Sequence, residues 1–157
     1  MNELLELEKI KQLKARYLRG LDTNDWDVFA GSMSEDCIGR YNSGKLRFNN
    51  RDEIVSFMQE NLSGEKVLTL HQAHQPEIEI IDEQTARGSW YLQDIVILLE
   101  PGVRTYGSAV YEDSYRKEGG EWMICATGYR RVFEAVEPLG EGHIILENMF
   151  PKAEGNQ

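Results

Sequence analysis

The chain has 157 residues, two cysteines and a formal net charge of −10 at pH 7. This length is typical of one domain with its own apolar core, so we expect a single domain over residues 1–157. The acidic balance and the scattered lysines and arginines argue against nucleic acid as a partner, and two cysteines are too few for a disulfide framework.

Three helices are predicted in the first 64 residues. From about Glu3 to Asp22, apolar side chains recur every three or four positions, which is typical of an amphipathic helix. The oxygens of residues 23–25 can cap a short second helix that reaches Met33, and Asn50 can cap a third that stops at Gly64. This acidic, periodic start differs from a secretory signal, and no apolar run approaches a membrane span, so we expect a cytoplasmic protein without membrane association.

The remainder of the chain changes to the pattern of β-strands. Four segments are rich in β-branched and aromatic residues, around 78–81, 90–99, 106–115 and 122–133. Turn signals separate them at 82–84 and at Gly119-Gly120. Helices followed by hairpins predict an α+β domain in which helices cover one face of a curved antiparallel sheet.

Asp94 is a polar residue in a strand that is otherwise apolar on that face. It alternates with Trp90, Leu92, Val96 and Leu98, so it is predicted to face the core. A buried carboxylate needs a donor, and the candidates across the preceding hairpin are His71 and His74. Pro76 is expected to mark a bulge, and strand parity does not decide between the two histidines. A zinc pair of His71 and His74 is a weaker alternative without a third ligand, and we predict no metal.

Three further polar residues stand out. Tyr17 lies on the apolar stripe of the first helix, where its hydroxyl needs a partner or serves only the core. Asp22 lies at the end of that helix and can cap it, bridge helices or belong to a site. Arg130 and Arg131 are adjacent in a strand, so one is predicted to point inward, where it could neutralise Asp94 or Asp22.

Several segments resemble SnoaL-like proteins, which share the cone-shaped fold of nuclear transport factor 2. The segments that carry the resemblance are Ile10 to Tyr17 with Leu21 and Asp22, Tyr41 to Leu46, His71 to Ile78, Trp90 to Asp94, and Ala126 to Arg131. The likeness extends from about Ile10 to Met149. Within the superfamily it is greatest to the bile-acid 7α-dehydratases of intestinal bacteria. It implies a cone-shaped antiparallel sheet covered by N-terminal helices, in a homotrimer or homodimer.

The resemblance also implies site residues. The 7α-dehydratase pocket is described by a tyrosine, two aspartates, a histidine and an arginine, and the matching positions are Tyr17, Asp22, His71, Asp94 and Arg131. This favours His71 over His74 as the partner of Asp94 and leaves His74 as a substrate-binding candidate. The implied activity is that of a hydro-lyase without cofactors, acting in a closed apolar pocket on a small cyclic ketone such as a steroid or its thioester.

For such a reaction we expect His71 to remove a proton next to a carbonyl while Asp94 holds the imidazole in the right tautomer. Tyr17 would donate to the carbonyl oxygen, with Asp22 and Arg131 positioning the tyrosine and balancing charge. Two alternatives stay open. An isomerase or dehydrohalogenase begins with the same proton abstraction, and the fold also serves as a non-catalytic ligand-binding or assembly module.

Overall fold

Each helix begins at a side-chain cap that the sequence provides. In the computed structural model, which describes residues 2–150, Asn2 caps α1 (Glu3–Asp22), Asp25 caps α2 (Trp26–Gly31) and Asn50 caps α3 (Arg51–Leu62). The three predicted helices are therefore confirmed. Met33, expected in the second helix, instead opens the first strand, because the helix ends at Gly31 and the Ser32 hydroxyl donates to its last turn.

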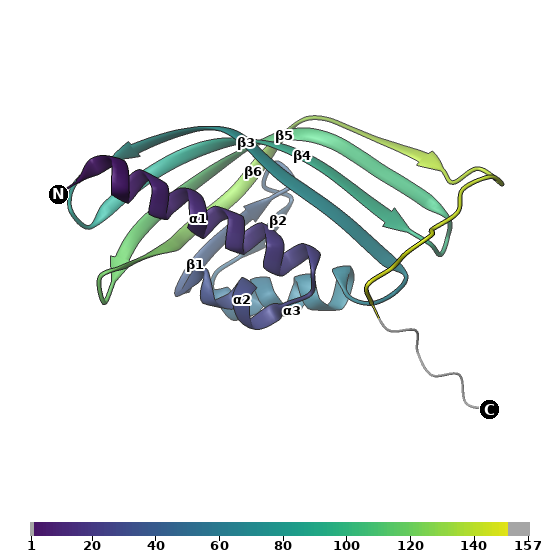
Figure 1. Ribbon diagram of the computed structural model, residues 1–157, viewed down its shortest axis with the longest axis horizontal. Helices are drawn as coiled ribbons and strands as arrows, with labels where there is room; N and C mark the ends of the chain where they lie inside the picture. The colour runs from purple at the N-terminus through teal and green to yellow at the C-terminus, as the bar shows by residue number, and fades with distance from the viewer. Residues whose placement is uncertain (1, 151–157) are drawn as a thin grey trace.

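A six-stranded curved sheet forms the other layer (Figure 1). Its strands are β1 (Met33–Tyr41), β2 (Leu46–Phe48), β3 (Val67–Ile80), β4 (Thr85–Leu98), β5 (Val103–Glu118) and β6 (Glu121–Pro138), in the order β2-β1-β6-β5-β4-β3. All neighbours are antiparallel except β1 and β6, which run parallel. β1 and β2 are not among the predicted strands, since Glu35 and Asp36 interrupt the apolar pattern of β1.

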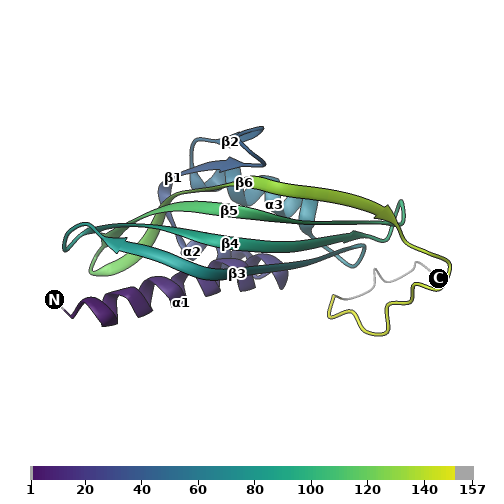
Figure 2. The same cartoon turned by 90° about the horizontal axis from the view of Figure 1, so that it is seen from above.

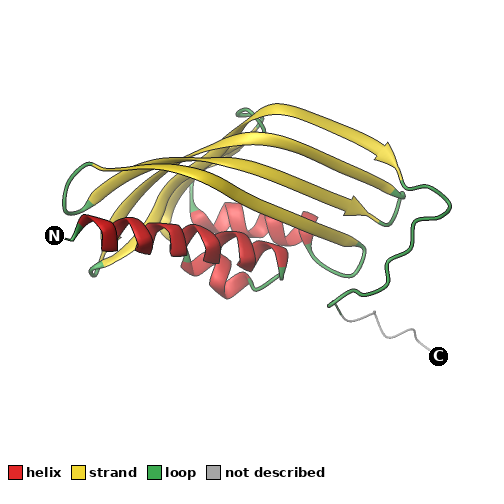
Figure 3. Cartoon of the chain, turned by 45° about the horizontal axis from the view of Figure 1, so that its top comes forward, coloured by secondary structure: helices red, strands yellow, loops and turns green. Residues whose placement is uncertain are grey.

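All three helices lie on the same face of the sheet, which we call the inner face; within residues 2–150 the opposite, outer face carries no helix (Figures 2 and 3). This confirms the predicted α+β architecture. Strands β3 to β6 are long, and they continue past the C-terminal end of α1 (Figure 3). The inner face therefore has a half that is covered by α1 and filled by the core, and a half beyond α1 that helices leave uncovered.

The covered half contains a dense core and a buried ion pair. Lys14 Nζ lies 2.8 Å from Asp113 Oδ2, and both side chains are essentially unexposed. Asp113 also accepts hydrogen bonds from the hydroxyls of Tyr115 and Thr127, at 2.8 and 2.6 Å. Burial lowers the pKa of Lys14, and the neighbouring carboxylate opposes this shift. Within residues 2–150, no helix combines the length and the apolarity needed to cross a bilayer.

Candidate active site

A histidine and a carboxylate meet where the end of α1 lies against β3. Asp22 is the last residue of α1, and His71 lies in the first half of β3. The Nδ1 atom of His71 and the Oδ1 atom of Asp22 are 2.6 Å apart, and the side chains are 9% and 19% exposed. Because an ionised carboxylate only accepts hydrogen bonds, Nδ1 carries the hydrogen, and in the neutral imidazole Nε2 then keeps its lone pair. This tautomer suits an imidazole that takes a proton from a bound molecule.

Two further donors on β3 hold the Asp22 carboxylate. The Thr69 hydroxyl donates to Oδ1 at 2.7 Å, and the backbone N–H of His71 donates to Oδ2 at 2.8 Å. β3 is the edge strand of the sheet, so this amide is available to a side chain from α1. Asp22, expected to support Tyr17, is thus the direct partner of His71 instead.

Asp94 faces the same side of the sheet but binds a different residue. The parity prediction is confirmed, because Asp94 is only 4% exposed and lies opposite His71 in the β3–β4 register. Its carboxylate is held by Arg131, with Nη1–Oδ1 and Nη2–Oδ2 distances of 2.6 and 2.8 Å. The expectation that Asp94 orients His71 is therefore wrong: the end of α1 brings Asp22 to the imidazole, and the guanidinium takes Asp94.

Arg131 reaches Asp94 from β6 by crossing β5. It passes over Gly107, which pairs with Asp94 and has no side chain; a Cβ there would lie 3.0 Å from Arg131 Nη1. Burial by itself would lower the pKa of Arg131, but the hydrogen bonds that it donates to Asp94 outweigh this effect and raise the pKa above its usual value. The guanidinium therefore stays charged, and it also lies 2.9 Å from Glu134. As predicted, one arginine of the adjacent pair points inward, while the Arg130 side chain is 68% exposed.

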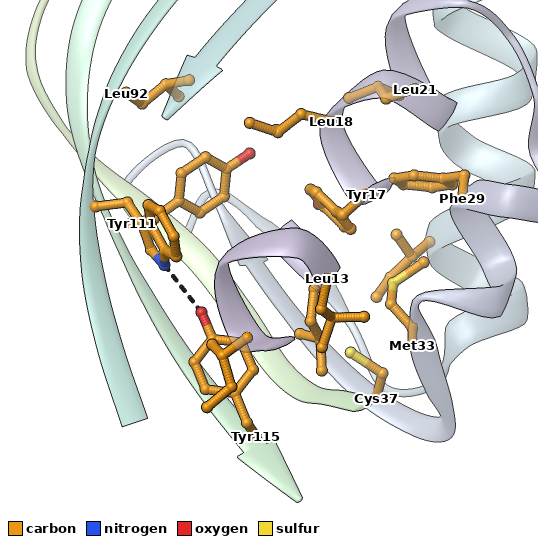
Figure 4. Close-up of a cluster of buried hydrophobic side chains, with 14 of the residues drawn as sticks. Leu13, Tyr17, Leu18, Leu21, Phe29, Met33, Cys37, Leu92, Tyr111 and Tyr115 are labelled. Atoms are coloured by element: carbon orange, nitrogen blue, oxygen red, sulfur yellow. Dashed lines mark hydrogen bonds between the residues drawn. The ribbon is translucent and has the colours of Figure 1, made fainter. Parts of the chain in front are cut away.

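Tyr17 lies deep in the covered half, among the core side chains shown in Figure 4. It is fully buried, and its hydroxyl is 2.6 Å from that of Tyr41. Burial raises the pKa of Tyr17 well above its usual value, so the phenol remains protonated. Within residues 2–150, the structure shows no hydrogen bond from Tyr17 to His71, Asp22 or Asp94, so its catalytic role stays a prediction.

His74 does not join the site. It lies three residues after His71, pairs with the half-exposed Tyr91 and faces outward, so the two histidines point to opposite faces. This geometry contradicts the expected role of His74 in binding a substrate next to His71. It also contradicts the alternative of a zinc pair formed by the two histidines. The bulge expected at Pro76 is confirmed, because the β3–β4 register shifts between His74 and Glu77.

The expected closed pocket is open in the part of the chain that the structure describes. On the inner face beyond α1, Val136 is 67% exposed and Val67, Val96 and Leu98 are half-buried. These side chains share the strand parity of Asp94 and Thr105, so they form an apolar floor next to the His71–Asp22 pair.

Sequence reasoning missed Thr69, Tyr41 and Gly107. The alternation of β3 placed Thr69 on the same face as His71, two positions away, and this signal was available. Tyr41 and Gly107 depend on contacts between distant segments, which no local pattern reveals.

Comparison with known proteins agrees with this fold. Residues 2–127 match the family model of the SnoaL-like domain. A protein of Novosphingobium aromaticivorans that provisionally carries the name scytalone dehydratase is 18% identical, with a TM-score of 0.78 over 91% of this chain and 97% of that one. A type 2 hexachlorocyclohexane dehydrochlorinase is 17% identical, with a TM-score of 0.78 over 91% and 95% of the two chains. The type 3 enzyme of Novosphingobium barchaimii is 17% identical, with a TM-score of 0.77 over 91% and 96%. Since the family model spans most of its length, this chain belongs to the family of SnoaL-like domains.

Proposed function

We propose that the protein is a lyase without cofactors that eliminates water from a cyclic hydroxyketone. The observation that carries the proposal is the His71–Asp22 pair, in which a 2.6 Å contact at Nδ1 leaves Nε2 as a base beside an open apolar face. A binding or assembly module has no need of such an oriented imidazole. The names of two structurally similar proteins, a dehydratase and a dehydrochlorinase, denote eliminations, which supports this class of reaction.

The proposed reaction starts with proton transfer to His71. Nε2 takes a proton from the carbon next to the carbonyl, and the C–H electrons move toward the carbonyl oxygen. Asp22 stabilises the imidazolium that results. The electrons then return to form the C=C bond as the C–O bond of the hydroxyl breaks. The imidazolium gives its proton to the leaving oxygen, so water departs and the base is restored.

Tyr17 keeps its proposed role as the donor to the carbonyl oxygen. In its pair with Tyr41 either hydroxyl can be the donor. When Tyr41 donates, the hydrogen of Tyr17 is available to a substrate oxygen that reaches this buried hydroxyl, and the pair polarises that donor further. A positioned donor of this kind contributes about 10²- to 10³-fold to a rate.

The charges near His71 favour an uncharged substrate ring. The charged groups around His71 include three carboxylates, those of Asp22, Asp94 and Glu134, and the guanidinium of Arg131, which already pairs with the last two. An anionic group on the reacting ring would meet excess negative charge, whereas an apolar ring fits the floor of valine and leucine. We therefore propose a steroid-like ketone of the bile-acid type, with any acidic or thioester tail directed to solvent.

The experiment compares wild-type protein with His71→Ala and Asp22→Asn on a hydroxylated steroid ketone. Formation of the conjugated enone is followed by ultraviolet absorbance and by mass spectrometry. We expect His71→Ala to lose about 10²- to 10⁴-fold in rate, because it removes the base. His74→Ala is the matched control, since it changes a histidine of the same strand on the opposite face.

Three results would overturn the proposal. Turnover by His71→Ala at the wild-type rate would show that the imidazole is not the base. A double bond that migrates without loss of water would assign an isomerase, and chloride release from a chlorinated cyclohexane as the sole activity would assign a dehydrohalogenase.

We also propose that the protein self-associates through its outer face. A hollow of about 470 Å³ on that face has walls of Tyr91, Tyr106 and Phe133, and two of these rings are about half-exposed. Sedimentation is expected to give a trimer or dimer, and a monomer at micromolar concentration would contradict it. A cytoplasmic location remains part of the proposal, supported by Cys37 and Cys125, which form no disulfide.

A further inference from the structure

We propose that Thr69 is a positioning residue of the site, whose hydroxyl fixes the Asp22 carboxylate so that His71 presents Nε2 in the basic tautomer. The role in turnover rests on the proposed function, whereas the effect on the imidazole does not. Thr69 contacts no reacting atom in this scheme; it acts through Asp22.

The Asp22 carboxylate receives three hydrogen bonds, and all of them come from one short stretch of β3. Oδ1 accepts from Thr69 Oγ1 at 2.7 Å and from His71 Nδ1 at 2.6 Å, while Oδ2 accepts from the His71 backbone N–H at 2.8 Å. Thr69 and His71 are two positions apart, so strand alternation places both side chains on the same face. The threonine thus holds Oδ1, the oxygen that also contacts the imidazole, and the edge-strand amide holds Oδ2.

The carboxylate needs this restraint because, within residues 2–150, its other hydrogen-bond donors are the imidazole itself and one backbone amide. Asp22 ends α1, so the helix does not continue past it to restrict its side chain, and the terminal torsion of an aspartate is broad. Its side chain is 19% exposed, so water competes for its lone pairs. With the Thr69 hydroxyl gone, the carboxylate can rotate about the remaining amide bond and exchange the Nδ1 contact for water.

That rotation changes the chemistry of the imidazole. A neutral histidine carries its hydrogen on either nitrogen, and the partner of Nδ1 decides which. If Nδ1 loses its acceptor, part of the population places the hydrogen on Nε2 and cannot accept a proton there. The structure therefore predicts that deleting one hydroxyl, which within residues 2–150 makes no hydrogen bond to the imidazole, reduces the reactive fraction of His71.

The test uses Thr69→Val, which keeps the branched shape and removes the hydroxyl, and Thr69→Ser, which keeps the hydroxyl. The main readout is the tautomer of His71, measured from the ¹⁵N shifts of its ring in the full-length protein. Wild type and Thr69→Ser are expected to show hydrogen on Nδ1, and Thr69→Val a mixture of both tautomers. Thr105→Val is the matched control: it makes the same change on the same face, and within residues 2–150 Thr105 has no side-chain hydrogen bond to the pair. It is expected to leave the tautomer unchanged.

With substrate, kcat of Thr69→Val is expected to fall about 10- to 100-fold, because a hydrogen bond to a charged group is lost, and Thr69→Ser should restore most of it. KM should change less than about twofold, since Thr69 does not bind the substrate in this scheme. If Thr69→Val fails to fold, Thr69→Ala carries the same expectation.

An unchanged His71 tautomer in a folded Thr69→Val or Thr69→Ala protein would overturn the positioning role, whatever the activity. Failure of the proposed function has a different signature, in which the tautomer responds to Thr69 while His71→Ala retains full turnover or no substrate is dehydrated.

Discussion

Replacing Arg131 by methionine tests the second charged pair of the site. Methionine keeps an unbranched apolar stem and removes the guanidinium, so both hydrogen bonds to Asp94 are lost. The Asp94 side chain, which is 95% buried, is then left without its partner. Leaving one partner of a buried pair alone costs about 3–5 kcal/mol of unfolding free energy. At about 2–4 °C per kcal/mol for a domain of this size, the melting temperature should fall by about 6–20 °C.

Urea unfolding reports this loss through the three tryptophans of the chain. Glu134→Gln is the control: Glu134 also pairs with Arg131 but is 42% exposed, so its removal should cost less than about 1 kcal/mol. Combining Arg131→Met with Asp94→Asn should recover a large part of the loss, because the isolated charge is gone. A cost below about 1 kcal/mol for Arg131→Met alone would show that Asp94 does not depend on the guanidinium, and the reasoning would fail.

Three further predictions concern packing and charge. Gly107→Ala should lower the free energy of unfolding by about 1–3 kcal/mol, because its new Cβ would lie 2.6 Å from a backbone oxygen of β6. Gly142→Ala is the control: among the described residues no atom lies within 4 Å of its new Cβ, so it should be neutral in the same urea experiment. Lys14→Met should cost about 3–5 kcal/mol by leaving Asp113 as an isolated buried charge, and calorimetry that finds an unchanged melting temperature would contradict this. Hydrogen bonds, first of all from a lysine of β5, lower the pKa of Glu6 from 4.5 to about 2. The ionised Glu6 side chain therefore contributes fully to folding stability above pH 4.5, and this contribution is lost as the pH falls toward 2. The stability difference between wild type and Glu6→Gln should therefore shrink over that pH interval, and a constant difference would refute the assignment.

The local patterns of the sequence were sufficient for the helices and for the direction of key side chains. The apolar spacing of α1 and the caps at Asp25 and Asn50 predicted the helices, because caps and periodicity act within a few residues. Alternation along β4 predicted that Asp94 points inward, and alternation along β6 predicted that one of Arg130 and Arg131 does; in the structure it is Arg131. These features depend only on neighbours along the chain.

The pairing of the charged residues could not be predicted in the same way. Two inward carboxylates, Asp22 and Asp94, compete for His71 and Arg131, and the outcome depends on where the end of α1 meets β3, 49 residues away. The reach of Arg131 depends on a register shift in the β5–β6 pair, which places it opposite Ala109. The resemblance named Asp22, His71, Asp94 and Arg131, which form these two pairs, but it did not predict which of them touch.

The parallel pairing of β1 with β6 has a consequence for how the chain reaches its native state. The Ser34 hydroxyl donates to the carbonyl of Ile124, 90 residues later, so β1 cannot complete its pairing in the sheet until β6 has been synthesised. During synthesis, the helices and the apolar side of the earlier strands emerge from the ribosome before β6 exists to complete the sheet. A topology with such distant contacts folds slowly, on the scale of milliseconds to seconds, and that apolar surface stays exposed until translation reaches β6.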